Sequence, residues 1–285
     1  MIEHIPDDMT CTVAAEVTLA ALQAELAKRG QWLPIDPSRP ERLTIGALLA
    51  NNESGPRRFG YGSIRDSLIG IKVALADGRV IKAGGQVVKN VAGFDLCKLF
   101  VGSRGTLGTI VEATFKLRPL PEAEKFVEIN CDSLPRAATI LERVLNSELT
   151  PVVLDLHNLT ALQVVLGFAG TREEVDWQVA QTAELHGHVM SNLGYDAKFW
   201  ADETAGALQR LSVLPSKITE AVGALGDVPF VARAGNGLIW YRGAAVAAVG
   251  DRGVGDNRAH RARLQLMQRV KDAYDPKHLL PEVTA

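Results

Sequence analysis

Residues 44–66 read TIGALLANNESGPRRFGYGSIRD, and residues 84–121 read GGQVVKNVAGFDLCKLFVGSRGTLGTIVEATFKLRPLP. Each stretch contains a glycine-rich loop, at Ser54–Gly62 and at Gly102–Gly108. Glycine allows positive φ and lets backbone N–H groups approach a ligand without a Cβ in the way. A large, planar, doubly phosphorylated cofactor needs such a close approach from two loops at once. From spacing alone, tight turns in an ordinary α+β domain are the competing interpretation.

Length and composition predict a globular protein of two domains. The chain has 285 residues, 47% hydrophobic and 22% charged, and domains usually hold about 100–150 residues. The net charge of −2 supplies no broad attraction to phosphate backbones, so no nucleic acid partner is expected. No run of about 18 consecutive apolar residues occurs, so we expect a cytoplasmic protein without direct membrane insertion. The three cysteines form no CxxC pair, and no metal site is predicted.

Hydrophobic periodicity in the first half predicts alternating strands and helices. The expected elements are a strand at 10–17, a helix at 18–29, strands at 68–76 and 80–83, a helix or turn at 95–101 and a strand at 110–117. Gly30 is placed to end the helix, and Asp77-Gly78 forms the turn of a hairpin. Pro119 and Pro121 punctuate the end of this domain, which we place at residues 1–122.

The second half, residues 123–285, has the order strand, helix, strand, strand, helix, strand. The segments are 126–129, 137–145, 151–156, 162–167, 172–185 and a return strand at 211–214. This order predicts an antiparallel sheet with helices on one face, the ferredoxin-like arrangement of the α+β class. Further expected elements are a helix at 217–225, strands at 229–234 and 238–242, and a final helix at 261–274.

The common nucleotide and hydrolase motifs are missing from the sequence. Gly60-Tyr61-Gly62 comes nearest to a dinucleotide fingerprint, but the third glycine and the preceding strand are lacking. GxxxxGK[ST], HExxH and GxSxG do not occur. The sequence therefore favours neither a Rossmann enzyme nor a kinase or hydrolase.

The quoted stretches together resemble the FAD-binding domain of the vanillyl-alcohol-oxidase (PCMH) type, and within it the FAD-binding subunit of glycolate oxidase. The resemblance is dense over residues 9–121 and looser at VLPSK (213–217), AGNG (234–237) and KDAYDPKHLLP (271–281). It implies an α+β fold in which a truncated two-part FAD-binding domain is followed by a ferredoxin-like cap domain. It also implies FAD as the cofactor, and the binding residues carried over by position are Thr44, Ile45, Gly46, Ser54, Gly55, Tyr61, Gly62, Asp66, Gly105, Thr106, Gly108 and Ile110.

Several of the polar residues in the first loop also have a purely structural interpretation. Asp66 precedes a strand and could cap local N–H groups. Tyr61 could pack in a core with its hydroxyl group hydrogen-bonded. Arg57 and Arg58 could contact phosphate or be solvated.

The sequence departs from the family in ways that bear on FAD affinity. Family members carry an additional N-terminal strand, helix and strand with a Gly-rich loop around the FAD pyrophosphate, and this sequence begins after the position of that unit. Ala47 stands where a second glycine is common. Loop glycines alone do not replace backbone donors to a pyrophosphate, so we expect FAD binding to be weakened.

No residue is assigned as catalytic. Oxidation of a 2-hydroxy acid by a flavin needs a base, commonly His, and cations that hold the substrate carboxylate. None of the six histidines lies in a motif that can be placed over a flavin. Arg233 precedes the AGNG turn, where related subunits often have His; it could face a ligand or be an ordinary edge-strand arginine.

The resemblance implies an FAD-binding subunit of a glycolate oxidase complex. Its implied partners are a catalytic flavoprotein subunit and an iron–sulfur subunit, and the substrate of the complex is a small 2-hydroxy acid. One alternative is a non-catalytic assembly subunit that has lost tight FAD binding. Another is a stand-alone small flavoenzyme, which would need a base and a carboxylate clamp and would turn over as the isolated protein.

Overall fold

The computed structural model describes residues 1–85, 96–202, 204, 206–245 and 257–283. The chain forms two compact units. Unit 1 comprises residues 1–55, 62–120 and the chain from Arg258 onward, and unit 2 comprises 56–61 and 121–257. The predicted domains, 1–122 and 123–285, differ from these units in two segments: the short piece 56–61 lies with unit 2, and the C-terminal helix lies with unit 1.

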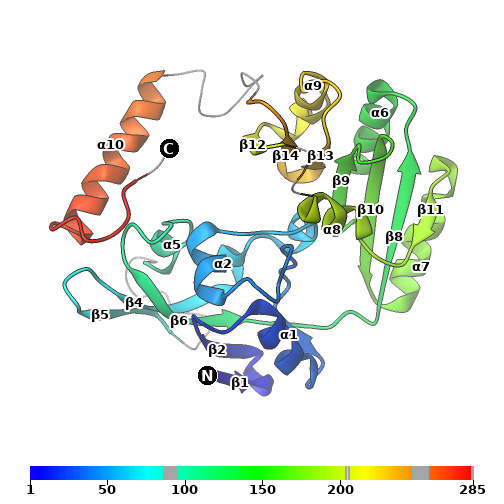
Figure 1. Cartoon of the computed structure of the whole chain (residues 1–285). Helices are drawn as coiled ribbons and strands as arrows, with labels where there is room; N and C mark the ends of the chain where they lie inside the picture. The colour runs from blue at the N-terminus through cyan, green and yellow to red at the C-terminus, as the bar shows by residue number, and fades with distance from the viewer. Residues whose placement is uncertain (86–95, 203, 205, 246–256, 284–285) are drawn as a thin grey trace. The chain divides into compact units, whose positions relative to one another are not determined.

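Unit 1 is built on an antiparallel five-stranded sheet (Figure 1). Its strands, in spatial order, are β1 (Ile2–Ile5), β2 (Thr10–Ala14), β6 (Thr109–Lys116), β4 (Leu68–Ala74) and β5 (Val80–Gly84). A second, two-stranded sheet pairs β3 (Gln31–Trp32) with β7 (Arg118–Pro119). The expected strands of the first half are present, and β1, which was not predicted, adds an edge strand with Ile2 opposite Val13.

Helices pack on this sheet through one apolar cluster. The helices of unit 1 are η1 (Pro6–Asp8), α1 (Leu19–Ala27), α2 (Ile45–Asn51), α4 (Ile64–Ser67), α5 (Cys97–Phe100) and α10 (Asn257–Tyr274). Thr18 caps α1 by accepting the amide of Ala21, and Gly30 follows the helix with φ +66°, a conformation that favours glycine. Leu22 of α1 and Leu48 of α2 are fully buried in the cluster that contains Phe115 of β6. Asp95, the expected first residue of α5, lies outside the described residues.

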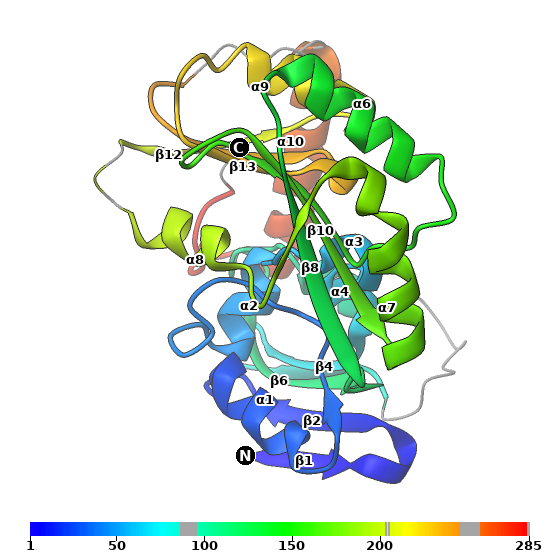
Figure 2. The same ribbon diagram turned by 90° about the vertical axis from the view of Figure 1, so that its right-hand side faces the viewer.

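Unit 2 contains an antiparallel seven-stranded sheet (Figure 2). Its strands, in spatial order, are β11 (His188–Met190), β8 (Ala123–Asn130), β10 (Gln163–Gly170), β9 (Val153–His157), β13 (Phe230–Arg233), β14 (Leu238–Arg242) and β12 (Leu208–Ser212). Counted along the chain, the first four strands have the spatial order 4-1-3-2, with α6 (Leu134–Leu145) and α7 (Arg172–Gln181) as the two connecting helices. This is the ferredoxin-like arrangement, and the predicted α+β class is confirmed.

The prediction for the fourth ferredoxin-like strand was wrong. The sequence placed it at 211–214, whereas β11 occupies that position and Leu208–Ser212 forms the opposite edge of the sheet. Three residues offer too little alternation for a periodicity argument. The preceding Gly187 is the better indication that the chain packs against β8 here, because a Cβ on this residue would lie 2.4 Å from Val127 Cγ1.

Helices cover both faces of the unit 2 sheet, not one face as predicted. The remaining helices of this unit are α3 (Arg58–Tyr61), η2 (Ala183–Leu185), α8 (Gly194–Ala201), η3 (Pro215–Lys217), α9 (Ile218–Gly223) and η4 (Ala234–Asn236). Residues of α6, α7 and α9 share the larger core with Leu154 and Leu156 of β9. Tyr195 and Phe199 of α8 pack instead with Val153. Because side chains alternate along a strand, Asp155 and His157 of β9 lie on the α8 face.

Candidate functional site

The TIG segment begins α2 and is held by hydrogen bonds within unit 1. Thr44 Oγ1 accepts the amide of Ala47 at 3.3 Å, which caps the helix. The Ile45 amide donates to Val17 O and the Gly46 amide to Ala15 O, both at 2.9 Å. These two amides are therefore engaged inside the protein.

Gly55 is needed for a close approach of two backbone segments. A Cβ on this residue would lie 1.9 Å from the carbonyl oxygen of Asp36, a distance that no side chain tolerates. Ser54 before it is half-buried. The close packing of the backbone against Asp36 is thus enough to explain why residue 55 is glycine.

The end of the first loop is divided between the two units. Tyr61 ends α3, belongs to unit 2 and packs against the apolar cluster on the α8 face. Gly62 lies in unit 1 with φ +84°. Asp66 Oδ2 accepts the amide and the hydroxyl of Ser63, both at 2.8 Å, so Asp66 caps α4. The structural interpretation of Asp66 accounts for these contacts.

The second loop reverses direction through Gly105, whose φ is +77°. Thr106 closes the turn, with its amide and hydroxyl both donating to Ser103 O at 2.9 and 2.7 Å. Gly108 lies where a Cβ would be 2.5 Å from Val73 Cγ1, and Ile110 is buried in the core of unit 1. The loop therefore has a defined shape, which the chain itself maintains.

The second loop is hydrogen-bonded to the last turn of α2. The Gly102 amide donates to Leu49 O and the Arg104 amide to Ala50 O, both at 2.9 Å. This contact brings the helix that starts with TIG beside the loop that contains GTLG.

Two buried polar atoms at this junction lack a partner among the described residues. They are Asn52 Oδ1 and Ser103 Oγ, and a Cβ on Gly102 would lie 3.6 Å from Asn52 Cβ. Buried polar atoms usually have a partner, so an orphaned pair is a signal for a ligand or ordered water. Neither residue was among those selected from the sequence, although Asn52 precedes the first loop in NNESG and Ser103 lies in the second in GSRG.

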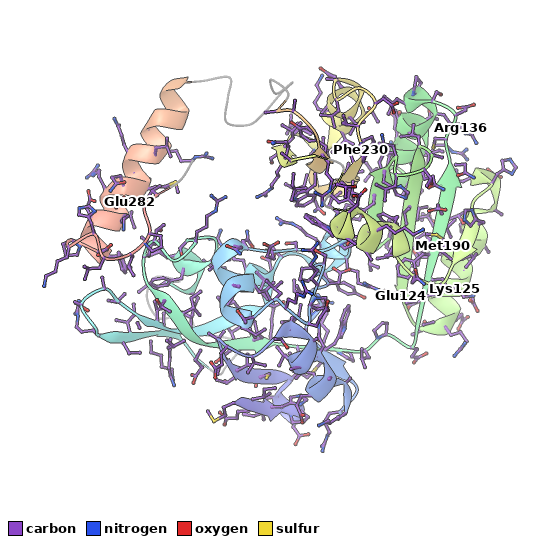
Figure 3. All side chains as sticks on the ribbon, viewed as in Figure 1. Glu124, Lys125, Arg136, Met190, Phe230 and Glu282 are labelled. Carbon is purple, nitrogen blue, oxygen red and sulfur yellow. The ribbon has the colours of Figure 1, made fainter. Side chains whose placement is uncertain are left out.

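Arg57, a candidate for contact with phosphate, is paired inside unit 2. Its guanidinium donates from Nε to Glu124 Oε1 at 2.6 Å and from Nη2 to Glu124 Oε2, and it lies 5.5 Å from the centre of the Phe126 ring. Figure 3 labels Glu124 and its neighbour Lys125, both at the start of β8. A bidentate pair of this kind neutralises the arginine.

A buried charge cluster on the α8 face of unit 2 has Arg233 at its centre. Arg233 is 1% exposed; its Nη1 donates to Asp155 Oδ2 and its Nη2 to Asp196 Oδ1, both at 2.5 Å. Tyr195 donates its hydroxyl to the same Asp155 Oδ2 at 2.5 Å. The His157 ring stacks on Tyr195 with 4.3 Å between ring centres.

Burial controls the protonation of this cluster. Burial raises the pKa of Asp155 to about 6, against the lowering effect of Arg233. Burial, assisted by the charge of Arg233, lowers the pKa of His157 to about 4. Arg233 is therefore neither an ordinary edge-strand arginine nor a free cation, because two carboxylates already neutralise it.

Among the described residues, no group of three His, Cys, Asp or Glu side chains could hold a metal ion. No helix in that part of the chain is long and apolar enough to cross a membrane.

Comparison with known proteins finds relatives for parts of the chain. Residues 1–84 match the family of FAD-binding domains. Glycolate oxidase subunit GlcD of Bacillus subtilis is 35% identical over 169 residues, which are 59% of this chain and 36% of that protein. Subunit GlcE of Escherichia coli is 37% identical over 124 residues, 43% of this chain and 35% of that protein. The matches thus span little more than a third of either relative.

Solved structures agree in fold. A crystal form of alkyldihydroxyacetonephosphate synthase superposes with a TM-score of 0.68 at 17% identity, covering 98% of this chain and 66% of that one. At this identity the likeness concerns the fold alone, and it extends over both units. The sequence matches, and not this likeness of fold, identify an FAD-binding domain related to those of the glycolate oxidase subunits, with FAD as its cofactor.

Proposed function

We propose that this chain is an FAD-binding subunit of a complex that oxidises a small 2-hydroxy acid, as glycolate oxidase does. The observation that carries the proposal is the match of residues 1–84 to FAD-binding domains, together with 35% and 37% identity to two glycolate oxidase subunits. When bound, FAD supplies the acceptor for two electrons and a site from which they pass onward. We further propose a catalytic flavoprotein subunit and an iron–sulfur subunit as partners, and the cytoplasm as the compartment.

The twelve residues selected from the sequence remain the proposed FAD contacts, and we add Asn52 and Ser103. The contact between α2 and the second loop supports this set, since it gathers Gly105 and Thr106 beside the helix that Thr44 begins. The orphaned Asn52 Oδ1 and Ser103 Oγ suit a cofactor with many hydrogen-bonding groups. The engaged amides of Ile45 and Gly46 limit that segment to side-chain and van der Waals contact.

The charge cluster favours electron transfer over substrate oxidation in this chain. A carboxylate substrate needs a cation that it can reach, and Arg233 is enclosed with its Nη atoms bound to Asp155 and Asp196. His157 is buried and has a pKa of about 4, so it is a weak proton acceptor. We therefore propose that the partner flavoprotein oxidises the 2-hydroxy acid.

Uptake of FAD by the purified full chain tests the proposal. We expect visible flavin bands and, after acid release, about one FAD per chain, as for a single family site. The measurement is an absorption spectrum before and after addition of FAD and removal of unbound cofactor. A chain that stays colourless with excess FAD would contradict the proposal and favour the non-catalytic assembly subunit. The amides of the TIG segment support that alternative, because they are hydrogen-bonded inside the protein and do not donate to FAD.

Ser103→Ala separates a cofactor contact from a structural residue. Because Ser103 Oγ has no partner among the described residues, its removal is expected to leave the free energy of unfolding of the FAD-free chain unchanged or slightly raised. If the hydroxyl contacts FAD, the dissociation constant rises by about tenfold, the equivalent of one hydrogen bond. Urea unfolding without FAD and an FAD titration measure the two quantities. Unchanged affinity in a stable variant removes Ser103 from the site.

A further inference from the structure

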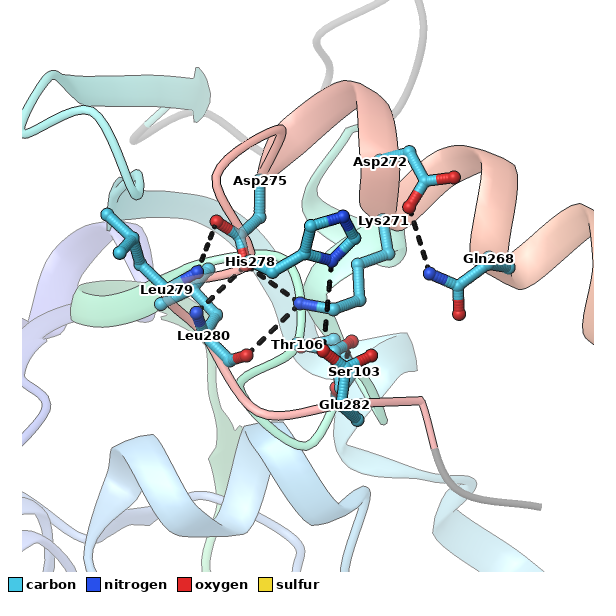
Figure 4. Close-up of polar contacts among 10 residues, drawn as sticks. All are labelled: Ser103, Thr106, Gln268, Lys271, Asp272, Asp275, His278, Leu279, Leu280 and Glu282. Carbon is cyan, nitrogen blue, oxygen red and sulfur yellow. Dashed lines mark hydrogen bonds and ion pairs between the residues drawn. The ribbon is translucent and has the colours of Figure 1, made fainter.

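The chain that follows α10 folds back into a closed turn around Asp275. Asp275 Oδ1 accepts the amide of Leu279 and Oδ2 accepts the amide of Leu280, both at 2.8 Å. Lys271 Nζ donates to Asp275 Oδ2 at 2.8 Å and to Leu280 O at 3.2 Å (Figure 4). One carboxylate and one ammonium thus tie the helix end to the segment after it. We name Lys271, Asp275, Leu279 and Leu280 the C-terminal clasp.

The two charged groups of the clasp are completely enclosed. The side chains of Lys271 and Asp275 are both 0% exposed. Burial by itself would raise the pKa of Asp275, but the hydrogen bonds from Lys271 and the two leucine amides lower it to about 2. The Asp275 carboxylate is therefore ionised at neutral pH, and removing either member of the pair would leave the other buried without its partner.

Residues next to the C-terminal clasp in the chain, Tyr274 and Pro281, lie against the second glycine-rich loop of unit 1 and against Phe100 before it. Tyr274 packs edge-on against Phe100, which precedes the loop, with 5.9 Å between ring centres. A Cβ on Gly105 would lie 4.0 Å from Pro281 Cγ. Figure 4 shows Ser103 and Thr106 beside the clasp. On its other side the loop is hydrogen-bonded to α2, so α2 and the clasp support it together.

The loop needs outside support because of its backbone. Arg104 has φ +51° and Gly105 has φ +77°, so two consecutive residues adopt the left-handed region. A non-glycine residue in that region persists where its surroundings maintain it. A segment some 170 residues further along the chain provides this support.

We propose that Lys271 and Asp275 are positioning residues for FAD: the C-terminal clasp holds residues 102–106 in the shape that binds the cofactor. The inference rests on the proposed function, since it assumes FAD at this loop. Lys271 and Asp275 themselves do not contact the cofactor. Loss of the clasp leaves the loop in its binding shape only part of the time, and the apparent affinity for FAD falls to that fraction of its native value.

The test is Asp275→Asn in the full chain, with Asp272→Asn as the matched control. Asp272 lies on the same helix and accepts a hydrogen bond from Gln268 at 2.9 Å, but on an exposed face (Figure 4). If a tenth of the loops stay competent, Asp275→Asn raises the dissociation constant for FAD about tenfold. Amide exchange at residues 102–106 without FAD is expected to accelerate in the same variant. Asp272→Asn is expected to change neither quantity.

The outcomes separate the inference from the function on which it rests. Equal FAD affinity in a folded Asp275→Asn chain, with unchanged exchange at 102–106, overturns the positioning role and leaves the proposed function standing. Failure of the native chain to bind FAD overturns the proposed function and the inference with it. If Asp275→Asn does not fold, Pro281→Gly removes the exposed proline side chain that lies next to Gly105 and is expected to weaken FAD binding without unfolding the chain. Native affinity in that variant would then count against the clasp.

Discussion

Replacing Arg233 with methionine is expected to lower the free energy of unfolding by about 3–5 kcal/mol, because removal of one partner leaves buried charges uncompensated. Arg233 donates to Asp155 and Asp196 from inside unit 2, and the two carboxylates are 1% and 6% exposed. Methionine fills a similar volume but donates no hydrogen bond. Two carboxylates would then lie together without a cation. Urea unfolding at pH 7 of the native and variant chains measures the difference.

Arg210 provides the matched control for this substitution. Its guanidinium lies 5.8 Å from the centre of the Trp240 ring, and that of Arg233 lies 5.6 Å from the same ring. Arg210 is exposed, so Arg210→Met is expected to cost at most about 1 kcal/mol. Adding Asp155→Asn to Arg233→Met is expected to recover part of the loss, since one of the two unpaired charges is removed. Equal effects of the two arginine substitutions would show that the cluster contributes no special stability.

Much of the fold could be predicted because local patterns match it. Leu19, Leu22 and Leu26 are spaced as one face of a helix, and all three are buried in the core of unit 1. Thr18 and Gly30 delimit that helix by capping and by a left-handed turn. The order of elements after residue 122 was enough for the first three strands and the two helices of the ferredoxin-like core, which follow one another without an insertion, but not for its fourth strand, β11. Hydrophobic periodicity and the residues that begin and end an element predict such local structure.

The division into units could not be predicted from the same patterns. Residues 56–61 lie between two glycines and show no period, yet Phe59 packs so closely that a Cβ on Gly235 would lie 2.1 Å from its ring. The last helix follows unit 2 in sequence but contributes Val270 and Tyr274 to the core of unit 1. The assignment of residues 56–61 to unit 2 and of the last helix to unit 1 depends on contacts between segments far apart in the chain. The sequence of a single segment gives no information about such contacts.

The charge cluster escaped the sequence argument for a related reason. β9 reads VLDLH, in which Asp155 and His157 look like the solvent face of a half-buried strand. They are buried because α8, which was not predicted, covers that face. The partner of Asp155 is Arg233, 78 residues away. The sheet register places Arg233 opposite Asp155, and α8 brings Asp196 to the same arginine.

Acidification is expected to destabilise the native chain through His157, and His157→Phe should remove this effect. Burial, assisted by Arg233, lowers the pKa of His157 from 6.5 to about 4. The folded chain therefore binds a proton less readily than the unfolded chain between these values, so its stability is complete above pH 6.5 and falls as the pH approaches 4. A shift of this size corresponds to about 3 kcal/mol. The neighbouring Glu128, 3.6 Å from His157 Nε2, acts in the opposite direction but does not prevail.

The quantity to measure is the difference in the free energy of unfolding between native and His157→Phe chains at several pH values. Asp155 is common to both, and its raised pKa of about 6 gives stability that is lost as the pH rises from about 4 to 6. This contribution opposes that of His157 in the native chain. The free energy of unfolding of the native chain is therefore expected to change less with pH than either group alone would cause. Subtraction isolates the histidine: relative to the variant, the native chain is expected to lose about 3 kcal/mol between pH 6.5 and 4. His157→Leu should give the same pH dependence, because the effect arises from proton uptake by the unfolded chain and not from stacking on Tyr195. A difference that is constant with pH would mean that His157 takes up its proton equally in both states, and the cluster would then be open to water.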